Sequence, residues 1–285
     1  MVKNLKYNIN KKEILYFYIR AIISIILYFI LIAAIVYSLE NNNPQTGVVY
    51  ILYSYAIIFG VYFFFRFGIL IGHIRSNSIK LSGNQFPEIF QIVKRQSELL
   101  GLKSIPGVYI MQSGGLLNAF AARFMGSNYV VLYSDILDVI SGKDTSILEF
   151  IIGHELGHIK RNHMLKKLLL SPSYLIPFLG AAYSRACEYT CDQIGYFLCP
   201  SGVKNGLLLF ASGKTNYHKV NLKEYLYQGI TETGFWVWFA EKVSSHPSLI
   251  NRLALFNDLP DINNTSSTIK AVEVKEEDHS KYMPR

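Results

Sequence analysis

FIIGHELGHIKRNH, residues 150–163, places two histidines four positions apart, with a glutamate directly after the first. Apolar residues in this run recur at helical spacing, which predicts a helix. On that helix His154 and His158 share one face, one turn apart, so both imidazole rings can reach one Zn²⁺ ion. Glu155 stands about 100° round the helix, where a general base for a metal-activated water is needed. The competing interpretation is a solvated helix with two ordinary histidines.

A third ligand is needed to complete such a site, and one familiar pattern for it fails here. That pattern requires a glycine at position 161 and a histidine at position 164. The chain has Arg161 and Met164 instead. His163 is one position away from the required place, and we expect it to be a surface histidine.

A later segment, YSRACEYTCDQIGYF at residues 183–197, supplies acidic side chains. Glu188 and Asp192 are four apart, so on a helix they share a face. Glu188 completes a His₂Glu ligand set with one coordination position left open, and Asp192 can hold the outer ring nitrogen of His154 or His158. The alternative is an ordinary amphipathic helix with exposed acids. We predict one Zn²⁺ per chain, bound by the two histidines and Glu188.

The composition is unusually apolar, and the excess lies toward the N-terminus. Hydrophobic residues make up 51% of the 285-residue chain, and the mean hydropathy is +0.23. Two apolar runs, residues 21–39 and 48–72, can each cross a hydrocarbon layer of about 30 Å as a helix. The polar link ENNNPQTG, residues 40–47, predicts a helical hairpin. A signal peptide is the alternative for the first run, but no small-residue cleavage site follows it.

The basic residues predict how this hairpin is oriented. The formal net charge is +8, and the link between the runs carries no lysine or arginine. Basic residues flank the other ends of both runs: Lys3, Lys6, Lys11, Lys12, Arg20, Arg75 and Lys80. The positive-inside rule therefore predicts that both chain ends are cytoplasmic. The charge fits a lipid bilayer as partner, and with no nucleic-acid motif visible we expect no nucleic-acid partner.

Four regions are expected along the chain. They are a basic cytoplasmic N-terminus (1–13), two transmembrane helices (14–75), a metallopeptidase domain (80–260) and a polar, disordered tail (261–285). Within the third region, GVYIMQS and NYVVLYSDIL read as strands of a small antiparallel sheet. The three cysteines are too few and too closely spaced for a disulfide framework, so we expect buried free thiols.

Four short motifs together resemble the HtpX-type family of integral-membrane zinc metalloendopeptidases, whose relatives include the CAAX prenyl protease. They are HELGH (154–158), SRACEYTCD (184–192) for the family's R-x-x-E-x-x-A-D, LLNAFAAR (116–123) for its N-A-F-A segment, and SSHPSLINRL (244–253) for its H-P-x-x-x-x-R. The resemblance covers about residues 105–255 and the hairpin. It implies a gluzincin-type domain, mainly α-helical with a small antiparallel β-sheet.

The resemblance also implies roles for further residues. Asn118, Ala119 and Phe120 match an edge strand that docks substrate. His246 and Arg252 would lie near the metal, where they support the transition state or the third ligand.

One departure from the family concerns the segment between the two metal-binding helices. The family has two further apolar spans there, whereas this chain has only residues 168–183, interrupted by Pro172 and Pro177. A single crossing would separate Glu188 from His158, and the gap is too short for two spans of about 20 residues each. We therefore expect this segment to cap the cleft or to lie at the bilayer surface.

Together these features predict a membrane-bound zinc endopeptidase acting on membrane-associated or misfolded polypeptides, with its catalytic domain facing the cytoplasm at a bacterial plasma membrane. Two alternatives remain. One is a specialised processing protease for peptide or lipidated precursors, and the other is a non-catalytic membrane scaffold that keeps a metal site. The sequence predicts neither the substrate nor the oligomeric state.

Overall fold

The computed structural model of the chain describes residues 7–40, 46–112, 114, 118–140 and 145–256. The polar tail expected at 261–285 lies outside these residues. The described helices are α1 (Lys11–Glu40), α2 (Thr46–Asn77), α3 (Pro87–Leu99), α4 (Ser134–Leu137), α5 (Ser146–Lys160), α6 (His163–Leu169), α7 (Leu179–Leu198), α8 (Val203–Ser212), α9 (Leu222–Thr231), α10 (Phe235–Val243) and α11 (Leu249–Ala254). Four short 3₁₀ turns, η1 (Asp138–Ile140), η2 (Ser171–Leu175), η3 (Pro200–Gly202) and η4 (Tyr217–Lys219), join some of them. The predicted mainly helical fold is confirmed.

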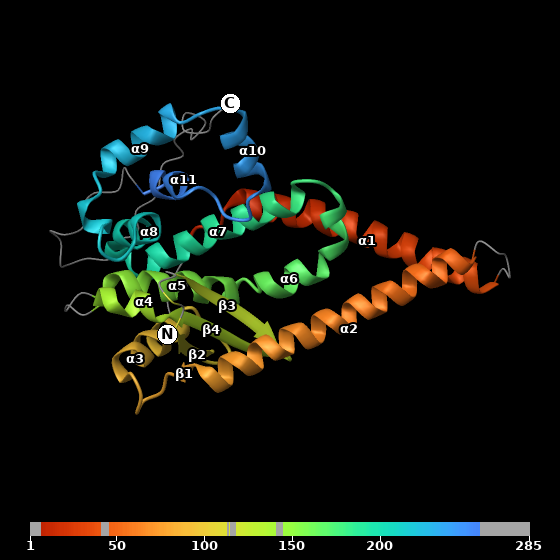
Figure 1. Cartoon of the computed structure of the whole chain (residues 1–285), viewed down its shortest axis with the longest axis horizontal. Coiled ribbons are helices and arrows are strands. Elements are labelled where there is room, and N and C mark those ends of the chain that lie inside the picture. The colour runs from red at the N-terminus through yellow and green to blue at the C-terminus, as the bar shows by residue number, and fades with distance from the viewer. Residues whose placement is uncertain (1–6, 41–45, 113, 115–117, 141–144, 257–285) are drawn as a thin grey trace.

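The two N-terminal helices form a long hairpin, and the end of α1 and the start of α2 lie far from the globular region (Figure 1). Within the described residues, two stretches are long and apolar enough to cross a membrane, Lys11–Ser38 and Tyr53–Asn77. Most of their apolar side chains face outward, as side chains in contact with lipid would. The segment 168–183 is not such a stretch, because it comprises the end of α6, the turn η2 and the start of α7.

At their other ends the hairpin helices diverge and pack on opposite parts of the globular region (Figure 1). The first half of α1 packs against α7 and η2, whereas the last turns of α2 pack against the sheet. Ile71 and Ile74 of α2 are buried in one apolar cluster with Tyr109 and Val131. The hairpin is therefore part of the packed structure as well as its most apolar element.

The sheet has four strands in the order β1 (Ile79–Lys80), β2 (Gly107–Met111), β4 (Ser127–Tyr133) and β3 (Ala119–Phe124). Strand β4 runs antiparallel to β3 and parallel to β2. The sheet is therefore mixed, which corrects the antiparallel sheet expected from the sequence. The reason is that the chain passes from β2 to the far edge before it turns back, so β4 enters between its two neighbours in the direction of β2.

Helix α5 is the centre of the core, because it is covered by the sheet, α3, α7 and α8. Its residues are buried on nearly every side, which explains why its sequence is apolar around most of its circumference. Helix α7 crosses it closely. A Cβ atom on Gly157 would lie 3.2 Å from Cys191 Sγ, and one on Gly153 would lie 3.2 Å from the Cα of Gly195. Glycine at these places lets the two helix backbones approach.

This close crossing predicts that Gly195→Ala destabilises the protein. An added Cβ would lie 2.8 Å from the Phe150 ring and 3.0 Å from its carbonyl oxygen, which belongs to the backbone of α5. Overpacking of this kind costs about 1–3 kcal/mol, more than the ~1 kcal/mol that alanine gains over glycine in a helix. The midpoint of thermal unfolding in detergent should fall by several degrees. The control is Gly72→Ala in α2, where a Cβ meets nothing within 4 Å. Equal midpoints for the two variants would contradict the close crossing.

Candidate functional site

The two histidines of α5 and the glutamate of α7 meet where these helices cross. His154 Nε2 lies 3.3 Å from Glu188 Oε2, and His158 Nε2 lies 3.5 Å from Glu188 Oε1. The two Nε2 atoms are 3.3 Å apart. Each residue thus offers one ligand atom, and the three atoms lie within 4.8 Å of one another. Two imidazole nitrogens and a carboxylate oxygen are a donor set that fits Zn²⁺, so the residues predicted as ligands are brought together as that metal requires.

His154 is held from behind by Asp192, which is itself paired with Arg252. Its Nδ1 lies 2.9 Å from Asp192 Oδ1, the contact expected for a histidine whose Nε2 faces a metal. Arg252 of α11 donates from Nε to Asp192 Oδ2 at 2.8 Å and from its other nitrogen to Oδ1. All three side chains are buried. The guanidinium of Arg252 is thus committed to Asp192, and it acts on the site through His154.

The pKa values of the two histidines are shifted in opposite directions. Burial disfavours a charged ring, but hydrogen bonds to Asp192 and Glu188 outweigh it and raise the pKa of His154 to about 10. Burial dominates at His158 and holds its pKa well below the usual value. Burial also opposes ionisation of Asp192, yet the charge of Arg252 keeps the pKa of this carboxyl below its usual range. The pKa of Glu188 is likewise held well below its usual value, so Glu188 and Asp192 are both ionised at neutral pH.

The side chains of His154, His158 and Glu188 line a cavity of about 480 Å³ that opens to solvent. Glu155 lines the same cavity without belonging to the ligand cluster. Its carboxyl is buried, and burial is the main reason why its pKa is raised to about 7. A carboxyl group with a pKa near neutrality can take up a proton and return it at the pH of the cell.

The predicted substrate segment forms one wall of this cavity. Asn118, Ala119 and Phe120 line it together with Ala121. They lie at the start of β3, which is the outermost strand on its side of the described sheet. This edge lies next to α5, and the binding of an extended chain there stays a prediction.

His246 approaches the site from the loop before α11. Its Nε2 is 3.6 Å from Glu188 Oε1, and its side chain is 64% exposed at the mouth of the cavity. Ser245 Oγ lies 3.0 Å from the other ring nitrogen and can fix the orientation of the ring. His246 and Arg252 both line the cavity, but the guanidinium of Arg252 is bound to Asp192, whereas the ring of His246 is largely exposed at the mouth.

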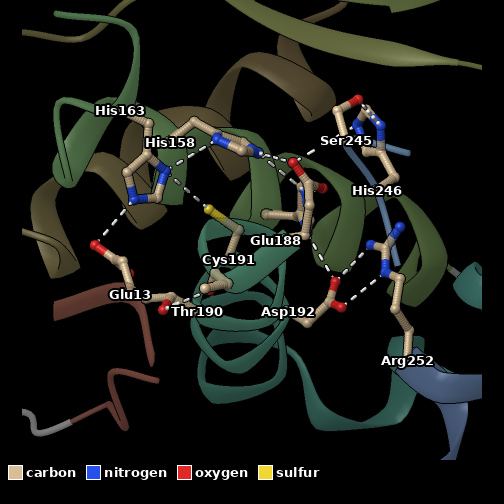
Figure 2. A network of polar contacts seen from close by, with 12 residues as sticks. Glu13, His158, His163, Glu188, Thr190, Cys191, Asp192, Ser245, His246 and Arg252 are labelled. Carbon is tan, nitrogen blue, oxygen red and sulfur yellow. Dashed lines mark hydrogen bonds and ion pairs between the residues drawn. The ribbon is translucent and has the colours of Figure 1, made fainter. Parts of the chain in front are cut away.

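A second set of contacts, on the far side of His158, was not predicted from the sequence (Figure 2). His163 was expected at the surface, and this expectation is wrong, because the residue is fully buried. Its Nδ1 lies 3.0 Å from His158 Nδ1, and its Nε2 lies 3.2 Å from Glu13 Oε1 of helix α1. The physical reason is the turn at Asn162, whose φ of 53° redirects the chain into α6 and points His163 inward. The one signal for Glu13 was an acid placed among lysines at the start of an apolar run.

The cysteines are buried free thiols, as predicted. Cys191 Sγ lies 3.6 Å from His163 Nδ1, so this thiol forms part of the wall around the missed contacts. Burial raises the pKa of Cys187 to about 12, which keeps it a neutral thiol.

Comparison with known proteins agrees with this geometry. Residues 84–175 match the family model for Peptidase family M48, a range that includes both histidines and ends before α7. The "Plastoglobule-localized metallopeptidase 48, chloroplastic" of Arabidopsis thaliana is 23% identical over 154 residues, which cover 48% of this chain and 43% of that protein. The "CAAX prenyl protease 1 homolog" of Dictyostelium discoideum is 29% identical over 132 residues, which cover 46% of this chain and 30% of that protein. The matched region is thus less than half the length of these curated relatives.

The geometry of the cluster predicts the metal content of variants. Purified protein should contain one equivalent of zinc, and Glu188→Ala should lose most of it, because two histidines alone leave the ion with too few protein ligands. His246→Ala should retain the metal, because this exposed ring lies outside the ligand cluster. Elemental analysis of both variants after the same purification makes the test. Full zinc content in Glu188→Ala would remove that residue from the ligand set.

Proposed function

We propose that this chain, whose residues 84–175 match the model of peptidase family M48, is a membrane-bound zinc endopeptidase that hydrolyses peptide bonds in membrane-associated or misfolded proteins. One observation carries this proposal. His154, His158 and Glu188 converge in an open cavity that is also lined by a carboxyl group suited to proton transfer and by the outermost strand of the described sheet. A non-catalytic scaffold would need the metal cluster but neither of the other two features.

The residues around the cluster divide the chemistry among them. A Zn²⁺ ion bound by the three ligands would act as a Lewis acid toward the scissile carbonyl and lower the pKa of a coordinated water to about 7. Glu155 takes the proton from the attacking water and later delivers it to the leaving amine. His246 donates a hydrogen bond to the oxygen that becomes negatively charged. Asp192, held by Arg252, fixes the ring of His154.

Substrate recognition is proposed to occur at the edge of β3. An extended polypeptide that adds beside Asn118, Ala119 and Phe120 would pair through its backbone, and backbone pairing tolerates many side chains. This tolerance fits a protease for unfolded segments of diverse sequence. The relative named as a CAAX prenyl protease homolog makes a lipidated precursor the second candidate class. Cleavage of casein compared with a farnesylated CAAX peptide distinguishes the two.

The hairpin sets where the enzyme works. Helices α1 and α2 would span the bilayer, and the cavity would lie beside the membrane on the side where α1 begins and α2 ends. The lysine-rich N-terminal flank and the uncharged link support a cytoplasmic catalytic domain. Polypeptides that emerge from or lie on the membrane would then be within reach of the β3 edge.

The proposed role of Glu155 predicts a separation of metal binding from activity. Glu155→Gln should keep its zinc, because Glu155 is not a ligand, yet lose at least about 100-fold in the rate of casein cleavage. Fluorescently labelled casein and the protein reconstituted in lipid provide the measurement. Glu149→Gln is the matched control on the same helix, since its carboxylate pairs with Arg95 away from the cavity. Turnover by Glu155→Gln within a few-fold of wild type would exclude Glu155 as the base.

The proposed orientation predicts which positions a membrane-impermeant thiol reagent can reach. Asn42→Cys, in the link between the apolar runs, should be labelled on intact cells. Lys223→Cys, exposed on α9 of the catalytic region, should be labelled only after permeabilisation. The native cysteines are buried and give a low background. The reverse labelling pattern would invert the topology.

A further inference from the structure

We propose that Glu13, in the first turn of α1, is a positioning residue for the metal centre. It acts through His163, which in turn fixes the ring of His158. The inference rests on the proposed function, because it takes His158 as a metal ligand. It goes further in assigning a role in the metal site to a residue of the first membrane helix.

The contacts form one continuous chain (Figure 2). Glu13 Oε1 lies 3.2 Å from His163 Nε2, and His163 Nδ1 lies 3.0 Å from His158 Nδ1. The two residues behind His158 are shielded from bulk water, because the side chain of Glu13 is 1% exposed and that of His163 is fully buried. Residues 150 positions apart in the sequence thus meet directly behind the ligand.

A single arrangement of protons satisfies every link of the chain. The Nε2 atom of His158 faces Glu188 and His154, so it must present its lone pair to a metal and its proton must reside on Nδ1. That Nδ1–H can donate only if His163 Nδ1 is the acceptor. His163 then carries its own proton on Nε2 and donates it to Glu13. An ionised carboxylate can only accept, so Glu13 selects this tautomer of His163 and, through it, that of His158.

Arg161 keeps Glu13 in the state that this arrangement needs. The guanidinium, just past the end of α5, donates to Glu13 Oε1 from Nη2 at 2.8 Å and from Nε at 3.1 Å. A buried carboxylate is stable as an anion when it is paired in this way. The Cys191 thiol faces His163 Nδ1 at 3.6 Å, but a thiol is a weak donor and does not compete strongly with the His158 ring.

The two ligand histidines are therefore supported in parallel ways. His154 is backed by Asp192, which is paired with Arg252, and His158 is backed through His163 by Glu13, which is paired with Arg161. The first support comes from α7 and α11, which carry Asp192 and Arg252. The second comes from α1, so it forms only when the hairpin is docked on the globular region.

A second metal ion is the competing interpretation of these side chains. Glu13, His163 and Cys187 also lie close enough to one another to hold an ion. The guanidinium of Arg161 donates to Glu13 Oε1, and its positive charge would repel a cation at this carboxylate. We therefore expect one zinc per chain, and a second equivalent lost in His163→Ala would overturn the positioning role.

The experiment measures zinc affinity of the full-length protein in detergent after its metal has been removed. Competition with a fluorescent zinc chelator gives the dissociation constant without any peptide substrate. Loss of an outer partner of a ligand histidine typically weakens metal binding 10–100-fold, and we expect this for Glu13→Ala and His163→Ala. Glu13→Gln keeps the volume and an acceptor oxygen but loses the charge, so it should fall between wild type and Glu13→Ala.

The matched control loosens the same helix elsewhere. Arg20 of α1 donates to Ser173 Oγ at 2.7 Å, a buried contact that does not touch the histidine chain. Ser173→Ala should therefore leave the dissociation constant within about twofold of wild type. The double variant Glu13→Ala with His163→Ala should bind zinc no more weakly than His163→Ala alone, because both act through one chain of contacts.

Cobalt substitution supplies a readout that a purely structural role would not move. The visible absorption of bound Co²⁺ reports the geometry of its ligands, and it should change in Glu13→Gln but not in Ser173→Ala. Unchanged affinity and spectrum in both Glu13 variants would overturn the proposal and reduce Glu13 to an anchor of α1. Absence of metal binding by the wild-type protein would instead overturn the proposed function, and the positioning role with it.

Discussion

The site depends on one steric constraint, the close crossing of α5 and α7. Glycines at positions 153, 157 and 195 let the two helices approach until a Cβ atom would have no room. This approach places the carboxylate of Glu188 3.3 Å from His154 Nε2. Since zinc–ligand bonds are only about 2 Å long, a wider crossing would leave the carboxylate out of reach of an ion held by the histidines. Packing therefore decides whether the three side chains form a metal site.

Two buried carboxylates near this crossing are each paired with an arginine. Asp192 meets Arg252, and Glu13 meets Arg161, so neither carboxylate is left alone in the interior. Buried pairs add little net stability, because desolvation offsets the attraction, but removal of one partner costs about 3–5 kcal/mol. Such pairs suit a site in which rings must hold one orientation. They also make the site sensitive to changes in residues that never touch substrate.

The hairpin is more than an apolar anchor. Helix α2 buries Ile71 and Ile74 against the sheet, and α1 brings Glu13 to the rear of the histidines. A boundary drawn at residue 80 from hydropathy therefore separates parts that pack together. The two apolar helices and the residues around the histidines therefore form one packed, hydrogen-bonded unit.

The sequence by itself determined what depends on local spacing. The apolar runs predicted the hairpin, and the four-residue intervals predicted which side chains share a face, His154 with His158 and Glu188 with Asp192. Tertiary structure alone decided the parallel pairing of β2 with β4, the burial of His163, and the partners of Arg252 and Glu13. These features join segments that are distant in the sequence, and no periodicity within a helix or strand encodes which distant segment it will meet.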